Sequence, residues 1–224
     1  MKFVVIEGLD GSGKSTQIKL LLKYLDNRKI SYRYLHFPRT ESPFFGELIS
    51  MFLRGDFGEL ANVNPYLVAM IYAGDRNDAK EKISKWLKAG HYVIADRYVS
   101  SNIAFQCAKI QNQKKRTTLK NWILKLEYDY YRIPKPDLQF FLDVPFDFTI
   151  KKLSVHRKGK DRRYLNGLTD IHEQDLEFQK EVRKVYLNIA RQDFHFYRID
   201  CSNKHNGILS PENIFEKLIA KLDI

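Results

Sequence analysis

Short apolar runs alternate with longer amphipathic stretches along the 224-residue chain. Continuous apolar runs are typical of parallel strands buried on both faces, whereas apolar residues spaced three and four apart indicate helices. The pattern predicts strands at residues 2–7, 32–37, 92–96, 138–144 and 195–200. It predicts helices near 14–28, 43–54, 64–89, 99–110, 117–131, 145–155, 173–191 and 211–222. This alternation favours a single α/β domain over residues 1–224, with a five-stranded parallel sheet flanked by helices.

Two of the predicted helices have recognisable starts. Ser210, Pro211 and Glu212 supply an N-cap, a proline at the first helical position and an acid in the first turn. Asp170 and Glu173 have the spacing of a capping box ahead of the 173–191 helix.

The segment 156–172 differs from the helices around it because it is polar and carries two glycines, Gly159 and Gly167. It also gathers the cations Arg157, Lys158, Lys160, Arg162 and Arg163. This composition predicts a mobile basic lid rather than a packed element.

Residues 8–15 read GLDGSGKS, a complete G-x-x-x-x-G-K-[ST] phosphate loop between the first predicted strand and helix. Its glycines let backbone N–H groups converge on an anion, and the following helix N-terminus adds partial positive charge. Lys14 is then placed to reach the outer phosphates, and the Ser15 hydroxyl to ligate Mg²⁺. We expect the nucleotide to be bound by Gly8, Leu9, Asp10, Gly11, Ser12, Gly13, Lys14, Ser15 and Thr16.

The sequence Asp96-Arg97-Tyr98 follows the third predicted strand at its carboxyl end, where ligands gather in open α/β sheets. An acid at this position holds a metal ion through its water shell, which predicts that role for Asp96. The adjacent Arg97 is suited to bind a second phosphate in bidentate fashion. An ion pair between Asp96 and Arg97 is the structural alternative.

Charge and composition narrow the function further. The chain has 38 Lys and Arg against 27 Asp and Glu, a net charge of +11 that suits polyanionic ligands. We expect no nucleic-acid partner, since no RNA-binding, zinc-finger or helix-turn-helix signature is present. With no 18-residue apolar run and a strand at its start, we expect no signal peptide, no membrane span and a cytoplasmic location. Cys107 and Cys201 match no metal or redox spacing.

Three motifs, GLDGSGKST from residue 8, DRYVSSNIAFQ from Asp96 and PKPDLQFFLDV from Pro134, together resemble the thymidylate kinase family. The similarity is collinear over essentially the whole chain. The resemblance implies a three-layer P-loop nucleoside monophosphate kinase fold with a mobile basic lid. It also implies Mg²⁺-dependent transfer of the ATP γ-phosphoryl group to dTMP, giving dTDP and ADP for dTTP synthesis. A homodimer is implied as well, with its interface on the 43–54 or 64–89 helix.

The resemblance assigns acceptor-side roles by position. Asp10 approaches the sugar hydroxyl, while Arg39, in the sequence Phe37-Pro38-Arg39, is offered to the dTMP phosphate together with Arg97. Tyr72 and Arg76 share a helix face by their i, i+4 spacing, where they provide a surface under the thymine and a cation for its carbonyl oxygen. The structural alternative is a core tyrosine and a surface arginine.

The same resemblance places further groups around the base and the sugar. Tyr98 crowds the 2′ position of the sugar and disfavours ribonucleotides. Ser101 and Gln106 read the base edge, and Phe105 packs near the thymine pocket. A pocket built around one methyl group discriminates by only ~1–3 kcal/mol, so the preference for thymine over uracil is expected to be modest.

On the donor side, the loop is neutral at Gly11, where some members of the family have a basic residue. The resemblance therefore implies that lid arginines supply the catalytic charge, with Arg162 and Arg163 first and Arg157 next. None of the histidines falls in a motif position, and the sequence assigns them no role.

The residues alone leave three other functions open. The first is another small-acceptor P-loop kinase, either a deoxynucleoside kinase or a different monophosphate kinase. The second is a nucleotide-gated switch or a nucleic-acid-associated ATPase. The third is a binding protein that has lost turnover, against which the intact Lys14, Ser15, Asp96 and Arg97 argue.

Overall fold

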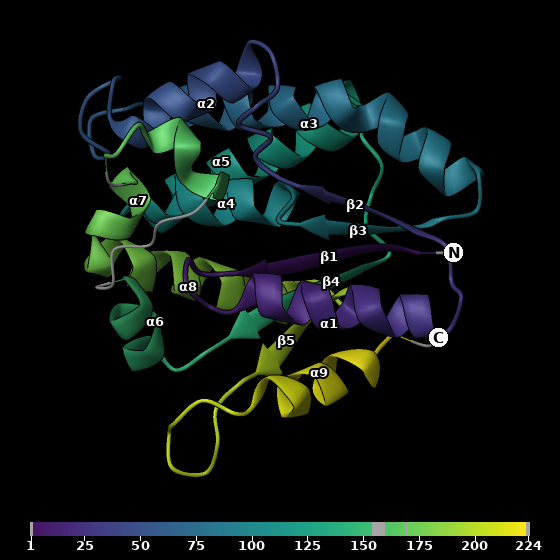
Figure 1. The fold of residues 1–224 in the computed structure, drawn as a ribbon. Helices are drawn as coiled ribbons and strands as arrows, with labels where there is room; N and C mark the ends of the chain where they lie inside the picture. Colours follow the sequence, from purple (N-terminus) through teal and green to yellow (C-terminus); the bar gives the residue numbers. More distant parts are fainter. Residues whose placement is uncertain (1, 154–159, 169, 223–224) are drawn as a thin grey trace.

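The computed structural model describes residues 2–153, 160–168 and 170–222, and its centre is a twisted parallel sheet (Figure 1). Five strands, in the spatial order β2-β3-β1-β4-β5, form this sheet in the described part of the chain. Their bounds are Phe3–Gly8 (β1), Tyr32–His36 (β2), Tyr92–Asp96 (β3), Leu138–Asp143 (β4) and Phe196–Asp200 (β5). All five strand predictions are confirmed. The inner strands β1, β3 and β4 are buried, mainly apolar runs, whereas the edge strands β2 and β5 contain both buried and more exposed residues.

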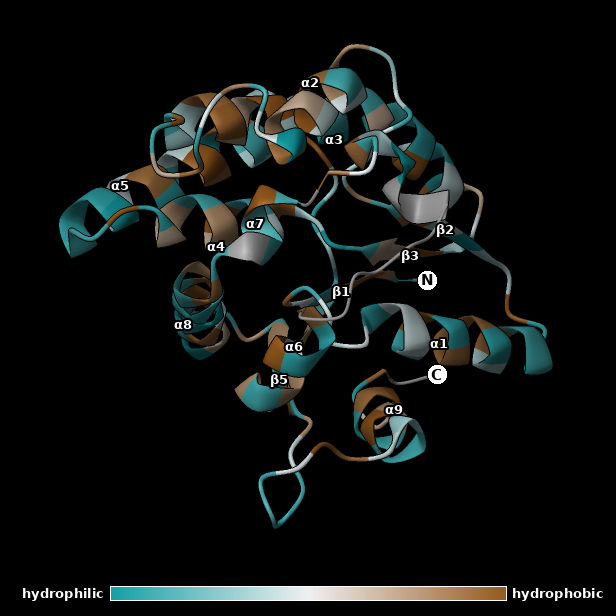
Figure 2. Cartoon of the chain, turned by 60° about the vertical axis from the view of Figure 1, so that its left-hand side comes forward, coloured by the Kyte–Doolittle hydropathy of each residue, from teal (hydrophilic) through white to brown (hydrophobic). Residues whose placement is uncertain are grey.

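Helices cover both faces of the sheet and complete a three-layer architecture (Figure 1). Their bounds are Lys14–Asn27 (α1), Phe45–Arg54 (α2), Pro65–Lys88 (α3), Val99–Ala108 (α4), Gln113–Leu124 (α5), Phe146–Leu153 (α6), Ile171–Gln174 (α7), Leu176–Gln192 (α8) and Pro211–Ile219 (α9). One apolar core joins the sheet to α1 and α9, and a second joins it to α3, α4, α5 and α8. Figure 2 shows hydrophobic and hydrophilic residues mixed along α1, α8 and α9, as expected for helices with one buried side. Among the described residues, no helix combines the length and apolarity that crossing a membrane requires.

Two predicted helices differ from the structure. The one expected at 117–131 begins earlier, at Gln113, and ends in a π-helical turn at Lys125–Tyr130. The one expected at 173–191 is divided, because Asp170 caps the single turn α7 and Asp175 caps α8 by accepting from the Phe178 N–H at 2.9 Å. The start predicted at Ser210 is confirmed, since its hydroxyl accepts from the backbone N–H of Asn213.

The segment expected to be an unpacked lid is partly packed. Residues 160–165 form a 3₁₀-helix, and Leu165, only 2% exposed, lies in an apolar cluster with Phe52 and Leu53 of α2. The prediction of an unpacked segment is wrong at this point because Leu165 interrupts an otherwise polar sequence with one buried apolar side chain.

The turn at residues 39–42 is held close against the first turn of α2. A Cβ added to the buried Gly46 would lie 2.4 Å from the Arg39 carbonyl oxygen and 2.9 Å from that of Thr40. Because both neighbours are backbone atoms, the close approach requires glycine at this position.

We expect Gly46→Ala to lower the free energy of unfolding by about 1–3 kcal/mol, the usual cost of overpacking. Urea denaturation measures this as a lower midpoint. Glu47→Ala is the matched control, since Glu47 is exposed on the same turn of α2. Equal midpoints for the Gly46 variant and the unsubstituted protein would contradict the packing argument.

Candidate functional site

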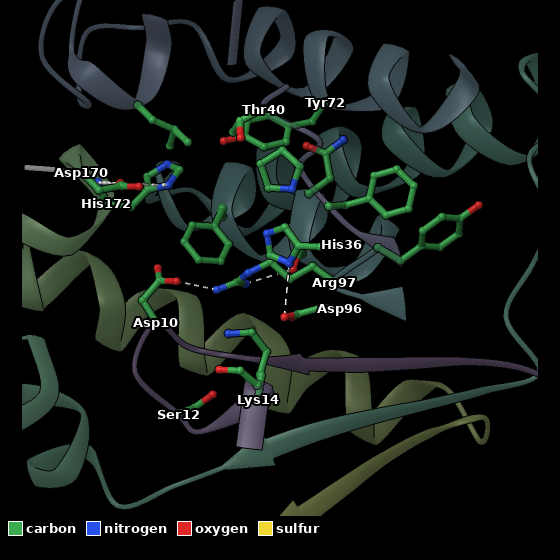
Figure 3. Close-up of a pocket in the computed structure, with 18 of the residues that line it drawn as sticks. Asp10, Ser12, Lys14, His36, Thr40, Tyr72, Asp96, Arg97, Asp170 and His172 are labelled. Carbon is green, nitrogen blue, oxygen red and sulfur yellow. Dashed lines mark hydrogen bonds and ion pairs between the residues drawn. The ribbon is translucent and has the colours of Figure 1, made fainter. Parts of the chain in front are cut away.

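A cavity of about 710 Å³ opens at the carboxyl ends of β1, β2 and β3. Figure 3 shows Asp10 and Lys14 from the phosphate loop approaching Asp96, which ends β3, and Arg97, which follows it. Ligands bind at this edge of open α/β sheets because the loops that follow the parallel strands meet there. The cavity is therefore the candidate active site.

The phosphate loop curls around its own lysine. Gly11 and Gly13 have φ of 75° and 85°, a left-handed conformation that glycine adopts without steric cost. The Lys14 ammonium donates to the carbonyl oxygens of Gly8 and Leu9 at 3.3 and 3.0 Å. Burial, and then the nearby charge of Arg97, lower the pKa of Lys14 to about 8. An anion bound to this loop would favour the protonated form of Lys14.

Most of the predicted loop residues line the cavity: Asp10, Gly11, Ser12, Gly13, Lys14 and Ser15. Gly8, Leu9 and Thr16 do not line it. Gly8 ends β1, where an added Cβ would lie 2.4 Å from the Ser12 hydroxyl oxygen, and Leu9 is 1% exposed in the core. Thr16 is exposed on α1. Some loop positions thus determine its curvature, and the others line the cavity.

Arg97 is fixed over the phosphate loop by several partners. Its φ of 66° places a non-glycine residue in the left-handed region directly after β3. Its guanidinium donates to the Asp10 carboxylate at 2.6 Å and to the Ser101 hydroxyl at 3.1 Å. The predicted alternative, a pair between Asp96 and Arg97, is thus replaced by a pair between Arg97 and Asp10. Burial alone would lower the pKa of Arg97, but Asp10 and then Tyr186 raise it, so the cation is permanent.

Glu7, next to the last residue of β1, holds the backbone that follows Arg97 through a fully buried carboxylate. It accepts from the backbone N–H groups of Tyr98 and Ser101 at 2.9 and 3.2 Å. It also accepts from the hydroxyls of Ser101 at 2.6 Å and Tyr186 at 2.9 Å. Ser101 lines the cavity, but its hydroxyl is engaged by Glu7 and Arg97 rather than directed at a base edge as predicted.

Asp96 lines the cavity, and one of its two oxygens lacks a hydrogen-bond partner in the described part of the chain. His36 Nδ1 lies 3.2 Å from Asp96 Oδ2, whereas the buried Oδ1 has no hydrogen-bond partner among the described residues. Burial would raise the pKa of Asp96, but the hydrogen bond from His36 and the charge of Lys14 outweigh it and lower the pKa. Asp96 is therefore an anion with an unpaired oxygen, as a ligand for a cation or its water requires.

A rigid group of polar side chains lies at the α3–α4 side of the cavity. Arg76 is 1% exposed and donates from Nε and Nη2 to the Glu127 carboxylate at 2.5 and 2.7 Å. Asn102 Nδ2 donates to the Ala69 carbonyl oxygen at 3.0 Å and to Glu127 Oε1 at 2.9 Å. Asn102 Oδ1 is buried and has no partner in the described part of the chain. Arg76 and Asn102 both line the cavity, so its wall holds a cation next to an amide oxygen that lacks a partner.

The predicted shared face of Tyr72 and Arg76 is confirmed, since both line the cavity. Burial of Arg76 excludes the alternative of a surface arginine. Phe37, Phe105 and Gln106 line the cavity too, and Gln106 Oε1 is another buried acceptor without a partner in the described residues. Tyr98 lines it as well, but its hydroxyl points elsewhere and donates to the Pro134 carbonyl oxygen at 3.1 Å.

The prediction for Arg39 is corrected by the structure, because this side chain is not part of the cavity wall. Arg39 Nε donates to Asp75 Oδ1 at 2.8 Å, and its Nη2 donates to Asp78 Oδ2 at 2.6 Å. The buried Asp75 carboxylate requires a cation, and Arg39 supplies it. The next two residues, Thr40 and Glu41, line the cavity instead.

The predicted lid arginines do not contribute to the described cavity wall. Arg163 is exposed and does not line the cavity. The side chain of Arg162 and all of Arg157 lie outside what the structure describes.

Asp170, the N-cap of α7, and His172, in its single turn, line the cavity (Figure 3), although the sequence pattern predicts no ligand-binding role for either. Asp170 accepts from the backbone N–H of His172 at 2.8 Å and from the Tyr164 hydroxyl at 3.1 Å. Burial and the nearby Asp10 raise the pKa of Asp170 to about 7. Burial, and then the charge of Lys109, lower the pKa of His172 to about 3. Both groups therefore favour their neutral forms, which a sequence does not reveal.

The sequence contains only weak indications that Lys19, His36 and Asn102 line the cavity. Lys19 follows Ser15 by four positions on α1, which places the two on one helix face. His36 ends β2 at the sheet edge where ligands gather. Asn102 lies inside the DRYVSSNIAFQ motif, but nothing in the string distinguishes it from its neighbours.

The neutral forms of Asp170 and His172 predict two opposite pH dependences of stability. Folded Asp170 keeps its proton between about pH 4 and 7, where the unfolded carboxyl has lost it, so stability falls as pH rises there. Unfolded His172 takes up a proton below about pH 6.5 while the folded ring stays neutral, so stability falls as pH falls. The two slopes, each at most ~1.4 kcal/mol per pH unit, oppose one another between about pH 4 and 6.5.

We expect His172→Phe to expose the first slope and Asp170→Asn the second, measured by urea denaturation between about pH 4 and 6.5. His205→Asn, at an exposed loop position, is the control. The same pH dependence in both variants and the unsubstituted protein would show that these two groups titrate alike in the folded and unfolded states.

Comparisons with known proteins identify the family of this chain. A profile of the thymidylate kinase family matches residues 6–210. A probable thymidylate kinase of Thermococcus kodakarensis is 33% identical over 218 residues, covering 93% of this chain and 95% of that protein. The thymidylate kinase of Plasmodium falciparum is 29% identical over 212 residues, 93% of this chain and 88% of that protein.

The structure of the Candida albicans thymidylate kinase has the same fold, with a TM-score of 0.74 over 99% of this chain and 91% of that one, at 23% identity. The profile match begins in β1, ahead of the phosphate loop, and ends at Ser210, the N-cap of α9. The chain belongs to the thymidylate kinase family.

Proposed function

We propose that this protein transfers the γ-phosphoryl group of ATP to dTMP and releases dTDP and ADP. Membership of the thymidylate kinase family makes it a phosphotransferase. The observation that carries the proposal is that one cavity joins Lys14 and Arg97 to Arg76 and Asn102. Cations suited to phosphates therefore lie in the same cavity as groups suited to a pyrimidine edge.

The paired groups of the α3–α4 side match a 4-oxo pyrimidine. Thymine presents an N3–H donor between two carbonyl oxygens, so Asn102 Oδ1 accepts from N3–H while Arg76 donates to a carbonyl oxygen. Cytosine has an acceptor at N3 and an amino donor at C4, which would face like groups. Leaving a buried polar group unpaired costs about 1–3 kcal/mol, enough to disfavour dCMP by roughly 10- to 100-fold.

The loop side of the cavity is suited to the reacting phosphates. Arg97 binds the dTMP phosphate, and Lys14 binds the outer phosphates of ATP. An oxygen of the dTMP phosphate forms a bond to the γ-phosphorus while the bond from that phosphorus to ADP breaks. No general base is required, because the acceptor phosphate is already ionised near neutral pH. Catalysis then rests on positioning and on stabilising the spreading negative charge.

Mg²⁺ fits the oxygen donors near the loop. The buried Asp96 Oδ1 lacks a partner within the described residues and points to a cation or its water, and Ser15 supplies a hydroxyl. The described residues contain no group of three or more carboxylate, imidazole or thiol side chains placed to hold a metal. We therefore assign the remaining ligands to ATP phosphates and water, as is usual for Mg²⁺. Bound Mg²⁺ neutralises phosphate charge, and lid residues Arg157, Arg162 and Arg163 are proposed to add to that effect.

A homodimer in the cytoplasm also belongs to the proposal. Leu67 and Met70 of α3 are 55% and 44% exposed, and such apolar side chains suit an interface between copies. Both lie on a helix that the sequence analysis named as a candidate interface.

An ADP-release assay with ATP and dTMP, dUMP, dCMP, dGMP or thymidine tests the proposed reaction. We expect the highest kcat/KM for dTMP, with dUMP reduced by roughly 10-fold, since one methyl group contributes ~1–3 kcal/mol. Faster turnover of thymidine than of dTMP would instead identify a nucleoside kinase, and no turnover of any acceptor would leave a binding protein.

The role of Arg97 has its own test. We expect Arg97→Ala to weaken dTMP binding by roughly 10- to 100-fold, the effect of losing a hydrogen bond to a charged group, and to raise the KM for dTMP accordingly. Thymidine affinity should stay nearly unchanged. Titration calorimetry with dTMP and thymidine measures both affinities. Arg116→Ala is the control, since Arg116 pairs with Glu181 outside the cavity wall. Equal weakening of the two ligands would show that Arg97 does not bind the phosphate.

A further inference from the structure

Glu127 lies directly behind the base-facing wall of the cavity without being part of that wall. Its side chain is fully buried in the π-helical turn Lys125–Tyr130 that follows α5. In this turn the Tyr131 N–H donates to the Leu126 carbonyl oxygen at 2.9 Å, an i→i+5 bond. Such wide turns change the helix face on which later residues lie and are frequent at functional sites.

One carboxylate holds both of the groups that face the base. Glu127 Oε2 accepts from Arg76 Nε at 2.5 Å, and Glu127 Oε1 accepts from Arg76 Nη2 at 2.7 Å and from Asn102 Nδ2 at 2.9 Å. A carboxylate that only neutralised Arg76 would not require the contact with Asn102. The shared oxygen Oε1 links the two side chains in a single rigid unit.

The orientation of the Asn102 amide follows from this contact. Its nitrogen lies between two acceptors, Glu127 Oε1 and the Ala69 carbonyl oxygen. A reversed amide would place its oxygen against both acceptors and lose both hydrogen bonds. Asn102 Oδ1 is therefore the atom left to face the cavity. The paired bonds to Glu127 likewise fix the plane of the Arg76 guanidinium, since the fork geometry of arginine is rigid.

We propose that Glu127 is a positioning residue that sets base specificity: it presents Arg76 as donor and Asn102 as acceptor to a 4-oxo pyrimidine. This inference rests on the proposed dTMP kinase function and names the group behind its selectivity. Glu127 touches neither the base nor the reacting phosphates. Its effect is confined to discrimination among acceptors.

Glu127→Gln tests the inference with little change of shape. The glutamine amide retains one acceptor oxygen, and its NH₂ group faces an N–H of Arg76 or Asn102. We expect kcat/KM for dTMP to fall by roughly 10- to 100-fold, mainly through KM, because a hydrogen-bonded charge is lost and a donor faces a donor. We expect dCMP to change much less, so that the dTMP to dCMP ratio falls, while the KM for ATP is unchanged.

Asp143→Asn is a matched control. Asp143 is also a buried carboxylate between arginines, with Arg183 at 2.6 Å and Arg198 at 2.7 Å, but it does not line the cavity. Its substitution should reduce stability, as measured by thermal denaturation, and leave the dTMP to dCMP ratio unchanged. The ratio thus separates base positioning from a general loss of structure.

A second variant, Asn102→Asp, keeps the test decisive if Glu127→Gln does not fold. It retains an oxygen for the base but places a carboxylate against Glu127 Oε1 and the Ala69 carbonyl oxygen. We expect it to lose discrimination between dTMP and dCMP, because repulsion by these two oxygens moves the new carboxylate away from its place beside Arg76. Retained discrimination in this variant would overturn the proposal.

The outcomes separate this inference from the function on which it rests. If the unsubstituted protein does not prefer dTMP over dCMP, both the proposed function and this inference are wrong. Unsubstituted protein that prefers dTMP, with an equal fall for both acceptors in Glu127→Gln, would overturn the role of Glu127 alone. A fall in the ratio with an unchanged KM for ATP supports it.

Discussion

A carboxylate buried at the end of the central strand connects the sheet to the cavity. Glu7 accepts hydrogen bonds from the backbone of Tyr98 and Ser101 and from the hydroxyls of Ser101 and Tyr186. Three of these four donors belong to Tyr98 and Ser101 at the start of α4, where a negative charge also interacts favourably with the helix dipole. A buried carboxylate without such partners would be very costly, so β1, α4 and α8 must come together correctly around it.

The same network determines where the site places its strongest cation. Arg97 lies between β3 and α4 with a positive φ, a conformation that costs about 1–3 kcal/mol for a side chain of this size. Its backbone N–H donates to the Ile6 carbonyl oxygen, and the next residue is held by Glu7. The backbone is therefore fixed on both sides of Arg97, and its side chain turns back over the phosphate loop to Asp10. Strain at one residue is offset by contacts that its neighbours make.

The sequence predicted what local pattern determines. The inner strands β1, β3 and β4 are mainly apolar runs, and the phosphate loop is a contiguous string whose glycines carry their own conformational requirement. Arg39 shows the limit of prediction from local pattern, because its side chain is held by Asp75 on α3, 36 positions away. Arg39 therefore turns from the cavity, and Thr40 lines it. His172 shows a second limit, since its neutral form comes from burial under groups far away in the sequence.

The base-facing wall illustrates the same limit more sharply. Arg76 could be identified from its spacing to Tyr72 on one helix, but its partner Glu127 lies 51 positions further along. That partner occupies a π-helical turn, whose apolar spacing reads as the continuation of an ordinary helix. Sequence pattern thus identifies a residue that faces a ligand more readily than the residue that holds it in place. The base specificity that we propose depends on both, because a donor and an acceptor discriminate between bases only when neither is free to rotate.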